Sequence, residues 1–197
     1  MRLFVAIDLG EAVRREAAGA SRELRRRFEG TPARLTWVPP ERMHLTVRFI
    51  GEVRDSEVPR LAATLAPPLP LLPFDLSWDG VDALPTAGRP RVIVVRALAG
   101  GEALHRLEQA VSDRLVQAGV PPEMRPYRPH LTLARVKDGG GVPFFEVLAG
   151  FEKRIFGSDR VEAITLFRSA VSSRGPVYEA LQRTTMDIPE RDSRDSR

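Results

Sequence analysis

The sequence contains no cysteine, and this absence excludes several kinds of chemistry. Its 197 residues can form no disulfide, thiolate zinc site or iron–sulfur cluster, and they offer no cysteine nucleophile. Long hydrophobic runs are also missing: the apolar stretch that begins at Leu3 is interrupted by Asp8, too soon for a signal peptide or a membrane span. We therefore expect a soluble cytoplasmic protein, with no membrane partner, whose chemistry depends on oxygen and nitrogen side chains.

Lysine is scarce as well. Lys137 and Lys153 are the only lysines, so nearly all of the 30 basic residues are arginine. Arginine makes planar, two-pronged contacts with phosphate, and the composition therefore permits a nucleotide or nucleic-acid ligand. A biased base composition of the gene would produce the same pattern, and a net charge of +4 is ordinary. Charge alone does not assign a partner.

Hydrophobic periodicity predicts a mixture of strands and helices. The expected strands cover residues 2–8, 74–81, 91–97, 161–167 and 177–186, and the expected helices cover 13–28, 58–65 after a cap at Ser56, and 102–118. Loops connect many of these strands, and no strand-to-helix turn carries a glycine-rich phosphate motif. The pattern favours an α+β fold with antiparallel sheets. We expect a single domain over residues 1–188, followed by a disordered polar tail at 189–197.

The most informative feature is an internal repeat. The tetrads His44-Leu45-Thr46-Val47 and His130-Leu131-Thr132-Leu133 share a His-Leu-Thr core, and each follows a proline-bearing segment. Both tetrads are therefore predicted to begin β-strands. Because side chains at positions i and i+2 share a face of a strand, each histidine projects with its threonine, while the apolar residues face a core. If the two halves of the chain are related by a pseudo-twofold axis, the two polar faces meet across a cleft.

Two histidines that face one cleft fit general acid–base catalysis. Near neutral pH one imidazole is neutral and accepts a proton, while the other is protonated and donates one. The hydroxyls of Thr46 and Thr132 can donate hydrogen bonds to phosphoryl oxygens, and the guanidinium of Arg135 adds positive charge. The sequence therefore predicts phosphate-ester chemistry that needs no metal.

Other uses of these histidines are less well supported. A catalytic metal site needs a third ligand, and neither tetrad supplies a carboxylate or a further histidine. The chain also has no recognisable serine nucleophile motif. The third histidine, His105, lies off the apolar face of its predicted helix, and we expect it to be exposed and without a role.

With these motifs the sequence resembles the two-histidine phosphoesterase superfamily, and within it the bacterial and archaeal RNA 2',3'-cyclic phosphodiesterases formerly called 2'-5' RNA ligases. The resemblance extends over most of the chain. Val47 and Ile50 stand where leucine is more usual, which is a conservative change. The segments that carry the resemblance are Arg2 to Asp8, Trp37 to Pro39, His44 to Gly51, Pro129 to Arg135 and Leu166 to Ser169, followed by Gly175 and Tyr178.

The resemblance implies a bilobal fold: two antiparallel β-sheets, related by pseudo-twofold symmetry, with helices on the outside and a central active cleft. It also implies that His44 is the proton donor and His130 the proton acceptor. His130 would activate water for attack on a 2',3'-cyclic phosphate, and His44 would protonate the departing 3' oxygen. The product would be a 2'-phosphate, formed without a cofactor or a metal.

The resemblance further implies that Thr46, Thr132 and Arg135 hold the phosphate. Phe49 and Tyr127 flank the tetrads and are candidates to stack on a base, although each could equally belong to the core. The expected substrate is RNA with a 2',3'-cyclic phosphate end or a small cyclic nucleotide, hydrolysed by a monomer. The reverse reaction would form a 2'-5' bond.

Two alternatives remain open. The protein could be a non-catalytic module that binds RNA ends or nucleotides, or it could act on another cyclic or 2'-5'-linked nucleotide.

Overall fold

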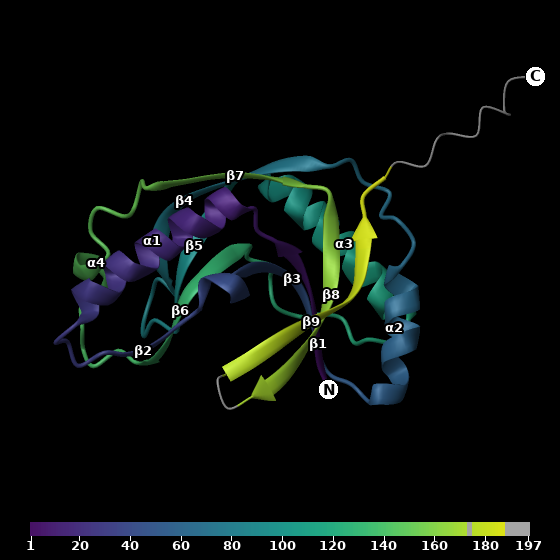
Figure 1. Ribbon diagram of the computed structural model, residues 1–197, viewed down its shortest axis with the longest axis horizontal. Coiled ribbons are helices and arrows are strands. Elements are labelled where there is room, and N and C mark those ends of the chain that lie inside the picture. The colour runs from purple at the N-terminus through teal and green to yellow at the C-terminus, as the bar shows by residue number, and fades with distance from the viewer. Residues whose placement is uncertain (173–174, 188–197) are drawn as a thin grey trace, which may run out of the picture.

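Nine strands form one curved antiparallel sheet in the computed structural model, which describes residues 1–172 and 175–187 (Figure 1). The order is β7-β4-β5-β6-β3-β1-β8-β9, and β2 pairs with β6. The strands are β1 (Arg2–Asp8), β2 (Arg34–Trp37), β3 (His44–Glu52), β4 (Phe74–Leu84), β5 (Val92–Ala99), β6 (His130–Asp138), β7 (Ile155–Val161), β8 (Ala163–Ser172) and β9 (Gly175–Thr185). The helices are α1 (Glu11–Phe28), α2 (Val58–Leu65), α3 (Gly101–Gln117) and α4 (Phe144–Val147), with short 3-10 turns η1 (Pro40–Arg42) and η2 (Asp55–Glu57).

The predicted strands and the three long helices are all present, and both tetrads begin strands, as expected. Two details of the prediction are wrong. The cap of α2 is Glu57, because Ser56 lies inside η2. The strand expected over 161–167 is divided at Glu162 between β7 and β8. The short elements β2, β7 and α4 were not predicted, and the expected tail at 189–197 lies outside the described residues.

The two expected sheets are joined into one. The pair Leu45 and Leu131 connects β3 to β6, so the four strands β3-β1-β8-β9 continue into β6-β5-β4-β7. The prediction treated the halves separately because the pattern of a single strand does not reveal which strand of the other half lies beside it. The junction brings the starts of the two tetrad strands together at the centre of the sheet.

A strand, a helix and an antiparallel partner strand occur in both halves. In one half, β1 pairs with β3, with α1, β2 and η1 between them in the chain; in the other, β5 pairs with β6, with α3 between them. A register shift interrupts each pairing at the last residue of the tetrad: Val47 in β3 and Leu133 in β6. The pairing of β1 with β3 has a second shift, at Ile50, which the pairing of β5 with β6 lacks.

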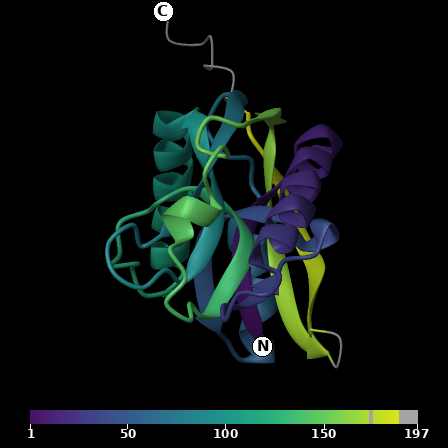
Figure 2. The ribbon, with the colours of Figure 1, turned by 90° about the vertical axis from the view of Figure 1, so that its left-hand side faces the viewer.

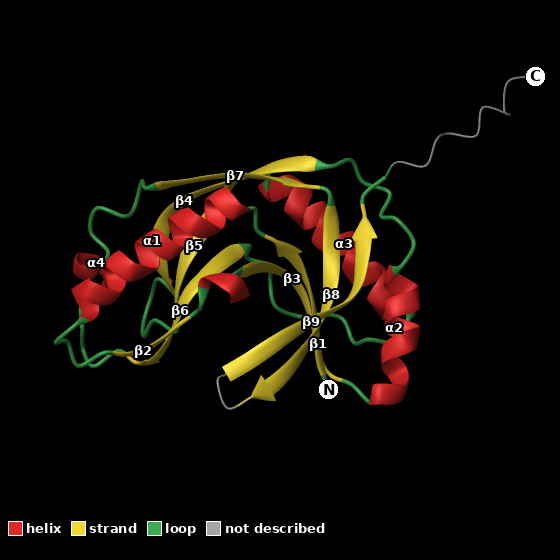
Figure 3. Cartoon of the chain, in the orientation of Figure 1, coloured by secondary structure: helices red, strands yellow, loops and turns green. Residues whose placement is uncertain are grey.

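The two long helices are exchanged between the halves. Helix α1, which follows β1, lies along β7 and β6, whereas α3, which follows β5, lies along β3 and beside α2. Figure 2 shows the sheet between the two helices, and Figure 3 shows helices outside the curve of the sheet. Their apolar residues join the apolar face of the tetrads in one core: Val13, Ala17, Leu24, Leu45, Val47, Leu104, Leu107, Val111, Leu131 and Leu133. Burial of this surface is the main source of stability.

A buried carboxylate fixes the start of α1 to the other half. Asp159 of β7 accepts hydrogen bonds from the backbone N–H of Gly10, at 2.9 Å, and from the indole N–H of Trp78 in β4, at 3.1 Å. Burial raises the pKa of Asp159 above its usual range, although both hydrogen bonds oppose this change.

Among the described helices, none combines the length and the apolar character needed to cross a bilayer.

Candidate active site

The polar faces of β3 and β6 line a cavity of about 620 Å³. The loops before both strands and the start of β9 complete its wall. Every residue singled out from the sequence for catalysis or substrate binding lies in this lining: His44, Thr46, Phe49, Tyr127, His130, Thr132 and Arg135. The structure therefore brings together two segments that lie more than 80 residues apart in the chain, in one cavity.

The pairing of β3 with β6 determines how the two tetrads face each other. Because Leu45 is the antiparallel partner of Leu131, the register sets His44 across from Thr132 and Thr46 across from His130. Both leucines are fully buried on the opposite face. Each imidazole is therefore the cross-strand neighbour of the hydroxyl that belongs to the other tetrad.

A β-bulge after each tetrad changes which residues face the cavity. In β6, Thr132 pairs with Val94 and Ala134 with Ile93, so Leu133 is the extra residue. The bulge shifts the alternation by one residue, and Arg135 joins Thr132 on the cavity side although three positions separate them. The same shift in β3 brings Phe49 to the cavity. The matching positions after the bulge thus carry a cation on β6 and an aromatic ring on β3.

Both histidines are held through the same ring nitrogen. The Nδ1 atom of His44 lies 2.8 Å from the carbonyl oxygen of Arg42, and that of His130 lies 2.7 Å from the carbonyl oxygen of Arg128. A carbonyl oxygen only accepts hydrogen bonds, so Nδ1 carries the proton in each neutral ring. This leaves Nε2 as the nitrogen that exchanges protons: it accepts one when the ring is neutral and donates one when the ring is charged.

The surroundings of His44 are mostly aromatic. The ring of Phe4 stacks on the imidazole with centroids 4.9 Å apart, and the ring of Tyr178 meets it edge-on at 5.2 Å. Burial lowers the pKa of His44 below 6.5, helped by the positive charge of Arg135. The hydrogen bond to the Arg42 carbonyl and the negative charge of Asp8, its cross-strand partner, act in the opposite direction.

His130 lies in a different setting. Its cross-strand partner on β5 is Arg96, where His44 has Asp8. In the described part of the chain no aromatic ring is in stacking contact with His130. The two imidazoles are thus held by the same backbone contact but face different charges and different packing, which is a basis for different roles.

Phe49 and Tyr127 were each expected in either the core or the cavity. Both line the cavity, and Tyr127 also packs against the core. The side chain of Phe49 is 52% exposed, which excludes the core. Tyr127 is half-buried; its hydroxyl donates to the backbone oxygen of Thr46 at 3.3 Å, and burial raises the pKa of this phenol. His105 is exposed, as expected, and its ring contacts the ring of Tyr127 edge-on.

An ion-pair cluster that the sequence did not reveal supports the loop before β6. The guanidinium of Arg48 is only 3% exposed; it donates to the carbonyl oxygen of Pro121 at 2.6 Å and lies 3.6 Å from a carboxylate oxygen of Glu123. Arg125 binds the same carboxylate through Nε and a terminal nitrogen, and lowers the pKa of Glu123 to about 2. These contacts hold the segment that carries Tyr127. No local pattern marks Arg48, because its partners lie more than 70 residues away.

Three further groups in the lining were also not identified as site residues: Arg42, Arg128 and Lys137. Tyr178, which belongs to the segments that carry the resemblance, lies against the ring of His44. Within residues 1–172 and 175–187, no three histidine or acidic side chains are grouped so that they could hold a metal ion. The lining also contains the carboxylates of Glu108 and Glu123, beside its imidazoles, hydroxyls and cations.

Comparison with known proteins agrees with this geometry. Residues 13–171 match the family model described as the 2'-5' RNA ligase superfamily. The chain belongs to the 2'-5' RNA ligase superfamily. A relative in this superfamily from Thermus thermophilus, named RNA 2',3'-cyclic phosphodiesterase, is 35% identical over 94% of this chain and 90% of its own length. One with the same name from Archaeoglobus fulgidus is 31% identical over 92% and 98%.

Two solved structures share the fold of this chain. A Thermus thermophilus protein covers 97% of this chain and all of its own, with a TM-score of 0.75 and 32% sequence identity. The E. coli protein LigT, solved in complex with 3'-AMP, has a TM-score of 0.70 and 23% identity, covering 94% of this chain and 97% of its own. The likeness to LigT concerns the fold alone.

Proposed function

We propose that the protein is an RNA 2',3'-cyclic phosphodiesterase, which opens the cyclic phosphate at an RNA end to a 2'-phosphate. The observation that carries this proposal is the pair of imidazoles in one cavity, each with Nδ1 bound to a backbone carbonyl and Nε2 left for proton transfer. Relatives at 31% and 35% identity over nearly the whole chain bear the name of this activity, which supports the same substrate class.

In the proposed reaction, Nε2 of His130 takes a proton from a water molecule as its oxygen bonds to phosphorus. The bond between phosphorus and the 3' oxygen breaks, and Nε2 of protonated His44 gives its proton to that oxygen. Each histidine ends in the protonation state with which the other began, and proton exchange with solvent restores them. Run in reverse with a 5'-hydroxyl in place of water, the same steps form a 2'-5' bond.

The phosphate oxygens are assigned to Thr46, Thr132 and Arg135. All three line the cavity, and the bulge in β6 brings Arg135 to the side of Thr132. Negative charge on these oxygens increases toward the transition state, and donors already in place stabilise it at little reorganisation cost. The exposed ring of Phe49 is assigned to the base of the terminal nucleotide, because an aromatic ring and a base stack with little regard to sequence. Tyr127, a half-buried ring in the same lining, is assigned to the same base.

The test is an assay of an oligonucleotide with a 2',3'-cyclic end, in excess chelator, with the product identified as a 2'- or 3'-phosphate. We expect the protein to form the 2'-phosphate at the same rate with chelator as without it. Complete loss of activity on chelation would contradict the metal-free mechanism. Tight binding without turnover would instead favour a non-catalytic RNA-end module, and faster turnover of another cyclic or 2'-5'-linked nucleotide would change the assigned substrate.

We propose that residues 1–188 form one catalytic domain, which acts as a monomer in the cytoplasm. The repeated β-α-β units place both histidines in one chain, so the cavity as described requires no second copy. Light scattering of the purified protein tests the oligomeric state.

A further inference from the structure

Lys137 lines the same cavity as the two histidines, at the end away from the tetrads. It lies on β6, two residues beyond Arg135 and on the same side of the strand once the bulge has shifted the alternation. Two residues of extended chain span about 6.6 Å. A line of cations therefore continues along β6 from the proposed phosphate site.

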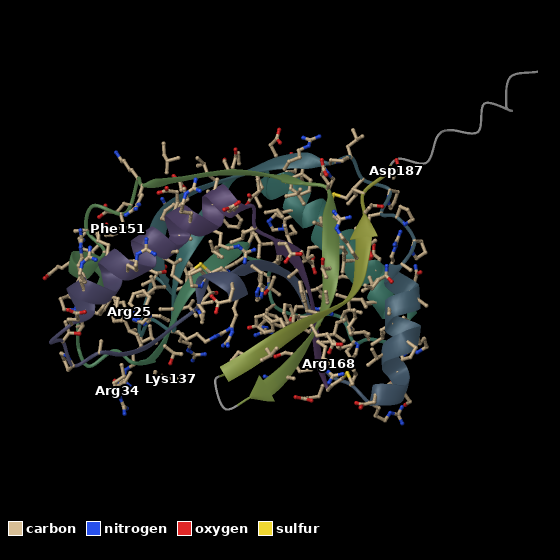
Figure 4. The ribbon with its side chains drawn as sticks, in the orientation of Figure 1. Arg25, Arg34, Lys137, Phe151, Arg168 and Asp187 are labelled. Carbon is tan, nitrogen blue, oxygen red and sulfur yellow. The ribbon has the colours of Figure 1, made fainter. Side chains whose placement is uncertain are left out.

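This part of β6 is held on both edges. β5 pairs with β6 along one edge and β2 along the other, with Thr36 and Val92 as the two partners of Arg135, and the N–H of Val136 donates to the carbonyl oxygen of Arg91 at 2.8 Å. Lys137 itself lies at the register shift of the β2–β6 pairing, between the paired residues Val136 and Asp138. Figure 4 shows Lys137 of β6 and Arg34 of β2 close together on one side of the molecule, with Arg168 of β8 on the other side.

The positive charge of Lys137 is available to a ligand. Its neighbour Asp138 is engaged by the guanidinium of Arg34, at 3.3 Å, and by the N–H of Gly140, at 3.1 Å. In residues 1–172 and 175–187, no acidic side chain lies within ion-pair distance of Lys137, Arg135 or Arg128. These three cations exceed what one cyclic phosphate, with a single negative charge, would require.

The β3 side of the cavity carries a different set of groups. Phe49 occupies the position that corresponds to Arg135, and the cation that β3 adds to the lining, Arg48, is already paired with Glu123. A ligand with a base at one side and a row of phosphates at the other matches this division.

We propose that Lys137 binds the phosphate that links the terminal nucleotide to the preceding one, so that the preferred substrate has at least two nucleotides. This inference rests on the proposed function. It assigns the terminal cyclic phosphate to the histidines, Thr46, Thr132 and Arg135, and the next phosphate of the chain to the lysine. The contact is electrostatic and reads no base.

The experiment compares three substrates: adenosine 2',3'-cyclic phosphate, the dinucleotide ApA with a 2',3'-cyclic end, and the same dinucleotide with a neutral methylphosphonate linkage. For the unmodified protein we expect kcat/KM for the charged dinucleotide to exceed that for the other two by about tenfold, the usual worth of one charge-assisted contact. In Lys137→Ala the ratio between the charged dinucleotide and the mononucleotide falls to about one. Lys153→Ala, which changes the only other lysine, keeps the ratio of the unmodified protein.

Salt provides a second measurement. One phosphate contact on a single strand contributes about 0.7 to the slope of log(kcat/KM) against log salt, so the slope for the charged dinucleotide decreases by about that amount in Lys137→Ala.

The inference fails if the unmodified protein does not prefer the charged dinucleotide, if Lys137→Ala keeps that preference, or if it loses the same factor on all three substrates. These results differ from failure of the proposed function, in which the unmodified protein hydrolyses none of the three substrates and the inference fails with it.

Discussion

Leu45 and Leu131 are cross-strand partners, and in the described part of the chain they are the pair that joins β3 to β6. Because they point into the core, the residues on either side of them point into the cavity, and the antiparallel register places each histidine across from the threonine of the other tetrad. The repeated sequence motif thus becomes one composite site, in which neither tetrad is complete without the other.

If each histidine transfers a proton, replacing either one removes a step that the other cannot perform. We expect His44→Ala and His130→Ala each to reduce kcat on a 2',3'-cyclic end by about 10²- to 10⁴-fold. His105→Ala is the matched control for kcat, because this exposed histidine lies outside the cavity lining and contacts the ring of Tyr127, which has no part in the proposed proton transfers. Steady-state kinetics measure the effect. Near-normal turnover in either of the first two variants would exclude the acid–base pair.

The pH dependence reports the titration of His44. Burial lowers the pKa of His44 below 6.5, and this pKa sets one limb of the dependence of log(kcat/KM) on pH. Asp8 raises that pKa, and Asp8→Asn therefore moves that limb to lower pH. Asp113→Asn, on the exposed side of α3, should leave the profile unchanged. A profile in which Asp8→Asn moves neither limb would contradict a role for His44 in proton transfer.

The buried guanidinium of Arg48 supports the loop that carries Tyr127. We expect Arg48→Ala to reduce the free energy of unfolding by about 2–4 kcal/mol, since it leaves a cavity and frees the carbonyl of Pro121. Arg48→Met keeps most of the side-chain volume, and the Nε atom of Arg48 has no hydrogen-bond partner in the first place, so we expect a smaller loss. Urea unfolding measures both. An unchanged midpoint in Arg48→Ala would contradict this account.

The carboxylate of Asp159 links the start of α1 to β4. Asp159→Ala leaves the N–H groups of Gly10 and Trp78 without their acceptor, at a cost of about 2–4 kcal/mol. Asp159→Asn retains an oxygen for one of the two donors and should lie between Asp159→Ala and the unmodified protein. Thermal unfolding measures the order of the variants. The control is Asp75→Ala on β4, a side chain 76% exposed, which we expect to change stability by less than about 0.5 kcal/mol. If Asp75→Ala lowers the thermal stability as much as Asp159→Ala does, the buried carboxylate has no special role as an acceptor.

Local pattern predicted the parts of the structure that local interactions determine. The tetrads could be placed on strands because histidine and threonine alternate with apolar residues after a proline, and α1 and α3 because their apolar residues recur at helical spacing. The same alternation places His44, Thr46, His130 and Thr132 in the cavity. Arg135 and Phe49 reach the cavity only because of a bulge, and Tyr127 lies in the loop before β6, so these three residues do not follow from the strand period.

What the sequence could not provide depends on contacts between distant segments. The charge of Arg48 would suggest an exposed position on β3, but the loop at 121–125 covers it and supplies its partners. Lys137 gives no local sign of a binding role until β6 is placed beside the cavity. The pairing of β2 with β6 is also non-local, and the four residues of β2 are too few for their pattern to predict it.

The exchange of α1 and α3 between the halves has a consequence for how the molecule holds together. Each β-α-β unit sends its helix to cover the other unit's sheet, as in domain-swapped dimers, but here both copies belong to one chain. Separated from its counterpart, either half would expose the apolar surface that the missing helix covers. We therefore expect the two halves to unfold together in a single cooperative transition, and a fragment limited to one tetrad to lose its own half of the active site.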